Sequence, residues 1–123
     1  MSGTDILADT NICIYLLNGD ENLAQVLQHQ NLSISIITEM ELCAYHNKPA
    51  SLQLLNVFLE SVSIINIDEK VKSKAIYLRK VSKLKLPDCI VAASAMAYNT
   101  PLITADKAFK KIEDLDLILY ENF

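Results

Sequence analysis

Glycine and proline are scarce in this sequence: two glycines and three prolines occur among its 123 residues. Nowhere do they gather, with serine, into a linker that would divide the chain. Apolar residues make up 51% of the chain, which is enough to build one hydrophobic core. We therefore expect a single domain spanning residues 1–123.

Long hydrophobic runs are also missing. The longest apolar runs, such as "IVAASAMA" at residues 90–97, are much shorter than the ~20 residues that cross a bilayer as a helix. The first residues lack the basic flank and apolar block of a secretory signal. The sequence thus predicts a cytoplasmic protein with no membrane partner.

Paired cysteines and ligand-spaced histidines are absent. Cys13, Cys43 and Cys89 are scattered and form no C-x-x-C motif, which argues against a disulfide framework and a zinc-finger site. His29 and His46 stand at the ends of helix-like stretches without a companion. We expect small buried thiols and surface histidines.

Acidic residues exceed basic ones by 15 to 11, and the formal net charge of −4 argues against a general nucleic-acid binder. The basic residues are unevenly placed, because residues 70–85 hold seven of the 11 and no acid. This basic stretch fits either the solvated face of a helix or a track for phosphates. Its members are Lys70, Lys72, Lys74, Arg79, Lys80, Lys83 and Lys85.

Five short apolar segments alternate with helical patterns along the chain. The predicted strands are residues 5–8, 32–37, 62–67, 101–104 and 115–120. Helical spacing is found at residues 14–17, 23–29, 38–46, 51–60, 69–84, 87–98 and 106–112. Strands that alternate with helices form parallel sheets covered on both faces. We therefore predict a three-layer α/β/α fold with a central parallel sheet of about five strands.

Four acids stand beside these predicted elements: Asp9, Glu41, Asp88 and Asp106. Each has a structural explanation. Asp9 and Asp106 fit helix N-caps, and Asp88 suits the positive end of a helix dipole. The spacing Thr38-x-x-Glu41 fits a capping box. Capping, however, does not require the four acids to converge.

The position of three of these acids after strands suggests a second explanation. In parallel α/β sheets, residues that follow strands meet at one edge, near a switch in strand order. Converging carboxylates repel one another, so a cluster implies a bound cation. Oxygen ligands without a nearby His or Cys pair favour Mg²⁺ or Mn²⁺ over zinc. Such an ion activates water and polarises a phosphoryl oxygen, so beside the basic stretch the acids predict a phosphodiester site.

Two other acid-dependent chemistries remain open at this point. A phosphatase with an aspartyl nucleophile usually has a second acid two residues later, where this chain has Asn11. A receiver-like phosphoacceptor domain would use Asp68 or Asp9, but it would also need neighbouring acids at the first strand, which offers only Asp9 after the early Asp5. Both are less economical explanations of the four acids.

Four segments resemble, in their order and spacing, the motifs of a known family. They are "LADTNICIYLL", "SIITEMEL", "LPDCIVAASA" and "PLITADKAF", and together they span nearly the whole chain. The sequence resembles the PIN domain family and, within it, the VapC-type ribonuclease toxins of toxin–antitoxin pairs. The resemblance implies the same parallel α/β sheet.

The resemblance also implies a metal-dependent endoribonuclease that hydrolyses RNA, forms a homodimer and is inhibited by a cognate antitoxin encoded beside it. The motifs assign catalysis and metal binding to Asp9, Glu41, Asp88 and Asp106. Thr104 and Asn11 match positions that orient these acids through hydrogen bonds, and Thr10 shares the turn after the first acid. A further acid often found two residues after the fourth is Ala108 here.

The RNA-binding residues that we expect from the basic stretch are Lys72, Arg79, Lys83 and Lys85. A rival interpretation is a catalytically silent PIN-like module that binds an antitoxin or RNA, although a silent copy would not need all four acids. The candidate antitoxin surface is an apolar groove near the "AYHNK" and "NVFLE" helices.

Overall fold

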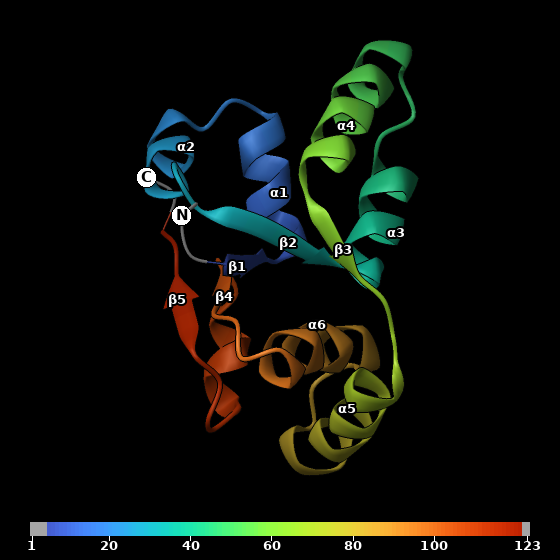
Figure 1. Cartoon of the computed structure of the whole chain (residues 1–123), viewed down its shortest axis with the longest axis vertical. Helices are drawn as coiled ribbons and strands as arrows, with labels where there is room; N and C mark the ends of the chain where they lie inside the picture. The colour runs from blue at the N-terminus through green and yellow to red at the C-terminus, as the bar shows by residue number, and fades with distance from the viewer. Residues whose placement is uncertain (1–4, 122–123) are drawn as a thin grey trace.

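Five parallel strands form the centre of the computed structural model, which describes residues 5–121. They are β1 (Asp5–Ala8), β2 (Asn31–Ser35), β3 (Ser63–Ile65), β4 (Leu102–Thr104) and β5 (Leu117–Leu119). Their order in the sheet is β3-β2-β1-β4-β5, and every neighbouring pair is parallel. The predicted α/β class and strand number are confirmed (Figure 1).

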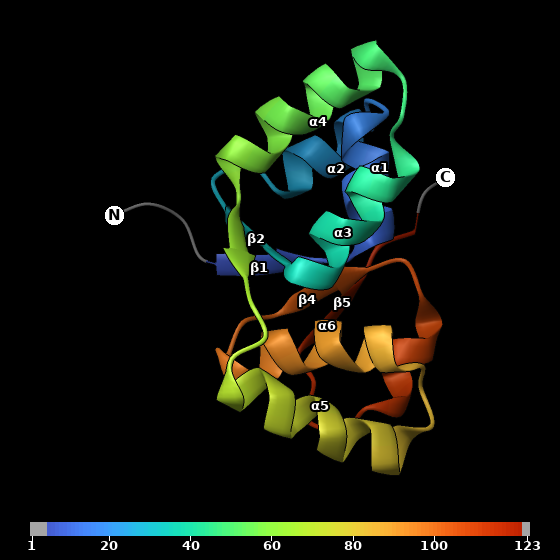
Figure 2. The same cartoon turned by 90° about the vertical axis from the view of Figure 1, so that its right-hand side faces the viewer.

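Helices cover both faces of the sheet. Figure 2 shows the first four on one side, namely α1 (Thr10–Leu17), α2 (Glu21–Val26), α3 (Ile36–Tyr45) and α4 (Pro49–Ser61). The other side carries α5 (Glu69–Ser82), α6 (Leu86–Ala97) and the 3₁₀ helix η1 (Lys107–Lys111). The predicted three-layer arrangement is therefore confirmed.

The hydrophobic core is split by the sheet into two clusters. Alternating residues of β1 point to opposite faces, so Leu7 packs with α5, α6 and η1, whereas Ile6 and Ala8 pack with α1 to α4. Leu7 and Ala8 are both fully buried. A central strand covered on both sides must be apolar throughout, which explains the continuous run "ILA" before Asp9.

The strand order reverses between β1 and β4. From β1 the chain first builds the sheet outward through β2 and β3, and then returns to add β4 and β5 on the other side of β1. In open α/β sheets, a crevice for ligands lies outside the carboxyl ends of the strands at such a switch. The carboxyl ends of β1 and β4 are Ala8 and Thr104, so this rule places the expected ligand site beside Asp9.

The start of α3 differs from the prediction. Strand β2 ends at Ser35, whose Oγ accepts a hydrogen bond from the backbone N–H of Ile37 (3.1 Å) and caps the helix. The helix thus begins at Ile36, and Thr38 lies inside it. The predicted capping box of Thr38 and Glu41 is wrong, because Ser35, three residues before Thr38, caps the helix and ends the strand-like run of β-branched residues.

Two further features concern membrane-spanning helices and the burial of the cysteines. Within residues 5–121, no helix is long and apolar enough to cross a membrane. Cys13 and Cys89 are buried as expected, but Cys43 is exposed on α3. All three cysteines are free thiols.

Candidate functional site

Asp9 lies at the switch in strand order, directly after β1. It is the N-cap of α1, and its Oδ1 accepts a hydrogen bond from the Thr10 backbone N–H (2.8 Å). Its Oδ2 accepts a second one from the hydroxyl of Thr104 (2.7 Å), which ends β4. Asp9 is only 7% exposed. One buried carboxylate therefore joins the ends of the two strands that flank the switch.

Asn11 and Thr104 shape the loop that follows β4. The Asn11 side-chain Oδ1 accepts from the backbone N–H of Ala105 (3.2 Å), and the Thr104 hydroxyl oxygen accepts from the N–H of Asp106 (3.0 Å). Asp106 then caps η1, because its Oδ1 accepts from the N–H of Ala108 (2.9 Å). These bonds hold the exposed Asp106 carboxyl on the loop beside the end of β1.

Glu41 reaches the site from α3. Its Oε1 accepts a hydrogen bond of 2.5 Å from the hydroxyl of Thr10. Thr10 is the first residue of α1, so it contacts Asp9 through its backbone and Glu41 through its side chain. The exposed Glu41 carboxyl is thereby fixed on the side of α3 that faces α1.

Burial and mutual repulsion raise the pKa of two of the acids. For Asp9, loss of hydration raises the pKa most; the bonds from Thr104 and Thr10 oppose this, and the charges of Asp88 and Glu41 raise it further. For the half-buried Asp88, loss of hydration again comes first, followed by the charges of Asp106 and Glu41, while Lys85 lowers the pKa. Each acid is coupled to at least one other, so the structure brings the four predicted acids into one electrostatic cluster.

The donor chemistry of this acid cluster, defined as Asp9, Glu41, Asp88 and Asp106, fits a hard cation. Its side chains offer carboxylate oxygens, which suit Mg²⁺ or Mn²⁺. Within residues 5–121, no three Asp, Glu, His or Cys side chains are already arranged around a metal position. Glu41 and Asp106 are exposed, and an ion bound between the four acids would offset their repulsion.

Three of the four predicted RNA-binding residues lie together, and Lys72 lies apart from them. Lys85 is the N-cap residue of α6, and Lys83 and Arg79 end α5, so these three lie at the end of the helix pair where Asp88 begins α6. Lys72 lies in the first turn of α5, about 16 Å from Lys83 along the helix axis. Its Nζ forms an ion pair of 3.0 Å with Glu69.

Asp68, the residue considered as a phosphoacceptor, is far from the acid cluster. It caps α5, accepting from the N–H of Val71 (2.9 Å), and it also accepts a hydrogen bond from the hydroxyl of Tyr98. Tyr98 ends α6, about 15 Å along the axis from Asp88. Asp68 and Asp9 therefore cannot share one phosphorylation site, and capping accounts for Asp68.

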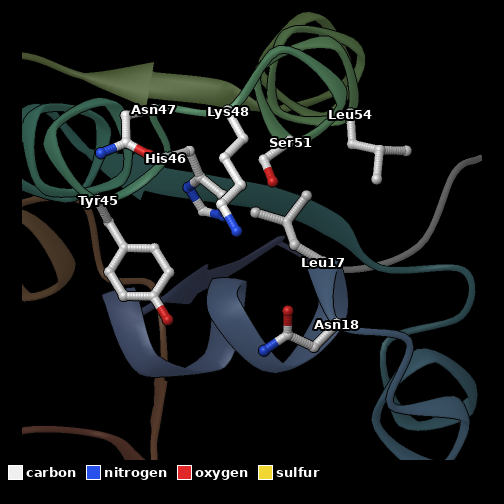
Figure 3. A pocket seen from close by; sticks show the side chains of 8 residues that line it. All are labelled: Leu17, Asn18, Tyr45, His46, Asn47, Lys48, Ser51 and Leu54. Carbon is white, nitrogen blue, oxygen red and sulfur yellow. The ribbon is translucent and has the colours of Figure 1, made fainter.

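A separate pocket of about 370 Å³ lies among the ends of α1, α3 and α4. Figure 3 shows Leu17 and Asn18 from the end of α1 opposite Tyr45, His46 and Lys48. The rings of Tyr45 and His46 meet edge to face with centroids 4.9 Å apart. The pocket is lined by residues of the "AYHNK" segment but by none of the "NVFLE" segment, and its side chains are both polar and apolar, so it matches the suggested apolar groove only in part.

Thr38 is the site residue whose position the sequence reasoning missed. It is fully buried, and its Oγ1 lies 3.0 Å from the Oγ1 of Thr10. The Thr-x-x-Glu spacing was available as a signal, since residues three apart on a helix share a face. With the helix start misplaced, the same spacing was interpreted as a cap.

Comparisons with known proteins agree with this geometry. Residues 6–115 match the family described as the PIN domain. A chain of a toxin–antitoxin complex from Klebsiella pneumoniae is 35% identical, with a TM-score of 0.84 and coverage of 95% of this chain and 99% of that chain. For VapBC-1 from nontypeable Haemophilus influenzae the identity is 26%, the TM-score 0.74 and the coverage 94% and 97%.

A third structure supports the fold alone. VapBC2 from Rickettsia felis, bound to a DNA fragment from its promoter, is 24% identical, with a TM-score of 0.79 and coverage of 95% and 99%. Among curated protein sequences, none matches significantly. The chain belongs to the PIN domain family. The resemblance to VapC-type PIN domains is thus confirmed.

Replacing Asp88 by Asn should change how the stability of the metal-free protein depends on pH. Because folding raises the pKa of Asp88, the folded protein binds this proton more tightly than the unfolded chain does. Stability is therefore lost as the pH rises from the ordinary Asp value of 3.8 through the raised one. The variant lacks this loss, so wild type should become less stable relative to Asp88→Asn as the pH rises above about 4.

The size of this effect should not exceed about 1 kcal/mol, because Asp88 is half exposed and solvent screens its neighbours. Thermal unfolding of both proteins in a chelator, across the same pH range, measures it. If wild type instead gains stability relative to the variant as the pH rises, the Asp88 charge is favourable in the fold and the acid cluster does not repel it.

Proposed function

We propose that the chain is a metal-dependent endoribonuclease and the toxin component of a type II toxin–antitoxin pair. One observation carries the proposal: the negative charges of the acid cluster repel one another at the switch in strand order. At Asp88, the positive charge of Lys85 offsets part of this repulsion. Capping explains Asp9 and Asp106 one at a time, but not why the four acids converge. A site for a divalent cation explains the convergence.

The proposed roles follow from where each side chain lies. Asp9, Asp88 and Asp106 would hold Mg²⁺ or Mn²⁺, and Glu41 would complete the site or accept a proton from the attacking water. The bound ion would polarise the phosphoryl oxygen and stabilise the leaving oxygen. Thr104 and Thr10 orient Asp9, Thr10 orients Glu41, and Asn11 orients the loop that carries Asp106. In-line attack would leave a 5′-phosphate and a 3′-hydroxyl, as the family resemblance implies.

Asp9→Asn should lower RNA cleavage by at least about 100-fold while the fold is kept, because the substitution removes the central negative charge of the proposed metal site. Purified wild type and variant are incubated with a mixed pool of structured RNA in Mg²⁺, in Mn²⁺ and in a chelator. Products that form only with wild type and a metal, and that carry 5′-phosphates, support the proposal.

Asp116→Asn serves as the matched control for this experiment. It makes the same chemical change on an exposed residue before β5, at the opposite end of the sheet from Asp9. Equal cleavage by Asp9→Asn and wild type would remove Asp9 from the site. Stoichiometric RNA binding without metal-dependent turnover in wild type, once bound antitoxin is excluded, would favour the catalytically silent module.

We further propose that the basic residues at the end of α5 and the start of α6, namely Arg79, Lys83 and Lys85, contact the RNA backbone. They lie at the end of α5 and the start of α6, on the same side of the acid cluster as Asp88. Arg79 and Lys83 are exposed. Lys72 belongs to the predicted set, but its position and its pairing with Glu69 make its contribution smaller.

Arg79→Glu, made in the inactive Asp9→Asn protein, should weaken RNA binding and reduce its dependence on salt. Removing one phosphate contact lowers the slope of log affinity against log salt by about 0.7 for a single strand. Lys72→Glu is the matched comparison and should change the slope less. If adding Arg79→Glu to the Asp9→Asn protein leaves the slope of log affinity against log salt unchanged, the basic residues form a solvated helix face and do not contact RNA.

The partner proposed for the α3 and α4 surface is an antitoxin protein. The structures from Klebsiella pneumoniae and Haemophilus influenzae are described as a toxin–antitoxin complex and as VapBC-1. In this chain, α3 and α4 expose several large apolar side chains, two of which, Tyr45 and Leu54, line the pocket of Figure 3. They are Met40, Tyr45, Leu52, Leu54 and Val57. Exposed apolar side chains beside a pocket are typical of a protein-binding surface.

Leu54→Glu should weaken antitoxin binding by at least about ten-fold, because it places a charge in an apolar interface. The tagged toxin is co-expressed with the protein encoded beside it, and the affinity is measured after separation. Ile67→Glu, an equally drastic change at an exposed residue before α5, should have little effect. Unchanged binding by Leu54→Glu would place the antitoxin on another surface.

The homodimer and the cytoplasmic location also remain proposals. A second apolar face, on the exposed side of α5, carries Ile76, Tyr77 and Val81. It lies in the opposite layer from α3 and α4, so one copy of the chain could contact a second copy and an antitoxin at the same time. The cytoplasm is where RNA substrates and an antitoxin encoded beside the toxin would be met.

A further inference from the structure

Thr38 is a buried polar residue for which the proposed function has no role. Its side chain is fully buried on α3, and its Oγ1 lies 3.0 Å from the Oγ1 of Thr10 on α1. Thr38 and Glu41 are three residues apart, so both face α1 from the same side of α3. Thr10 therefore lies within hydrogen-bonding distance of both side chains.

The direction of these hydrogen bonds is fixed by the number of protons. The Thr10 hydroxyl has one proton, and a carboxylate oxygen such as Oε1 of Glu41 accepts hydrogen bonds. The distance of 2.5 Å between Thr10 Oγ1 and Glu41 Oε1 is typical of a hydroxyl that donates to a carboxylate. With its one proton directed at Glu41 over the shorter distance, Thr10 has none left for Thr38, so the Thr38 hydroxyl can donate to the free lone pair of Thr10.

The hydrogen-bonded chain from Thr38 through Thr10 to Glu41 also contacts Asp9, because Thr10 bonds to both acids. The backbone N–H of Thr10 holds Asp9, while its hydroxyl holds Glu41. The Thr10 hydroxyl is held from two sides, because its proton bonds to Glu41 and its oxygen lies 3.0 Å from the Thr38 hydroxyl. Thr38 is fully buried, so close packing limits the movement of its side chain.

We propose that Thr38 is a positioning residue of the site: its hydroxyl locks the rotation of the Thr10 hydroxyl, which aims the exposed Glu41 carboxylate at the acid cluster. The proposal rests on the proposed function, because it assigns Glu41 to a metal-dependent site. Thr38 acts through Thr10 and touches neither the metal nor the RNA.

The test compares Thr38→Val with Thr38→Ser. Valine keeps the shape of threonine and removes the hydroxyl, whereas serine keeps the hydroxyl. Binding of Mn²⁺ alone is followed by electron paramagnetic resonance of the free ion. Thr38→Val should weaken Mn²⁺ binding by about three- to ten-fold, as expected for one lost hydrogen bond, and Thr38→Ser should stay close to wild type. Mn²⁺ binding by Thr38→Val that equals wild type overturns the proposal.

Thr100→Val is the matched control. Thr100 is also buried, its hydroxyl donates to the backbone carbonyl of Tyr98 (3.1 Å), and it precedes β4 at the opposite end of the sheet. It should leave Mn²⁺ binding unchanged. If Thr100→Val and Thr38→Val weaken binding equally, the loss reflects general stability and the proposal is wrong. Should Thr38→Val fail to fold, Thr38→Ser and Thr38→Ala form a second pair that differs only in the hydroxyl.

A double-mutant cycle separates this proposal from the proposed function. In a chelator, Thr38→Val and Glu41→Ala are combined, and the unfolding equilibrium should show a coupling of at least about two-fold. Additive effects, with Mn²⁺ binding and RNA cleavage intact in wild type, overturn the role of Thr38 alone. Wild type that neither binds Mn²⁺ nor cleaves RNA overturns the proposed function, and the positioning role is lost with it.

Discussion

The carboxylate of Asp9 is the group on which the arrangement of this molecule depends. It is buried where the strand order reverses, and a buried charge is costly unless it is hydrogen-bonded. Thr104 from the end of β4 and the backbone of Thr10 at the start of α1 supply those bonds. The same two residues then position the rest of the site, because Thr104 also accepts from Asp106 and Thr10 also donates to Glu41.

Repulsion among the acids opposes this arrangement. Two hydrogen bonds lower the pKa of Asp9, yet burial and the charges of Asp88 and Glu41 raise it overall. A protein selected only for stability would replace at least one of these acids, since a capping residue can be uncharged. Strain of this kind is usual at functional sites, where groups are held ready for a ligand that supplies the missing charge.

Much of this structure could be predicted from the sequence, and the failures have physical causes. Continuous apolar runs placed the strands, because a parallel strand is buried on both faces. Asp9 and Asp106 could be predicted because Asp9 directly follows β1 and Asp106 lies two residues after the end of β4. The start of α3 was misplaced because Ile36 and Ile37 continue the pattern of β2, and only the hydrogen bond of Ser35 shows where the helix begins. The distance of each basic residue from the acids could not be predicted, because the sequence of a helix does not show which of its two ends lies near them.

The acids come from all three layers, and this determines what keeps the site together. Asp9 follows the sheet, Glu41 belongs to the layer of α1 to α4, and Asp88 and Asp106 belong to the layer of α5, α6 and η1. The sheet fixes only Asp9. The separation of Glu41 and Asp88 depends on how α3 meets the other layer, and Ile37 in its first turn packs into the core formed with α5 and α6. Because that contact lies one turn from Glu41, the early start of α3 at Ile36 is itself a requirement of the site.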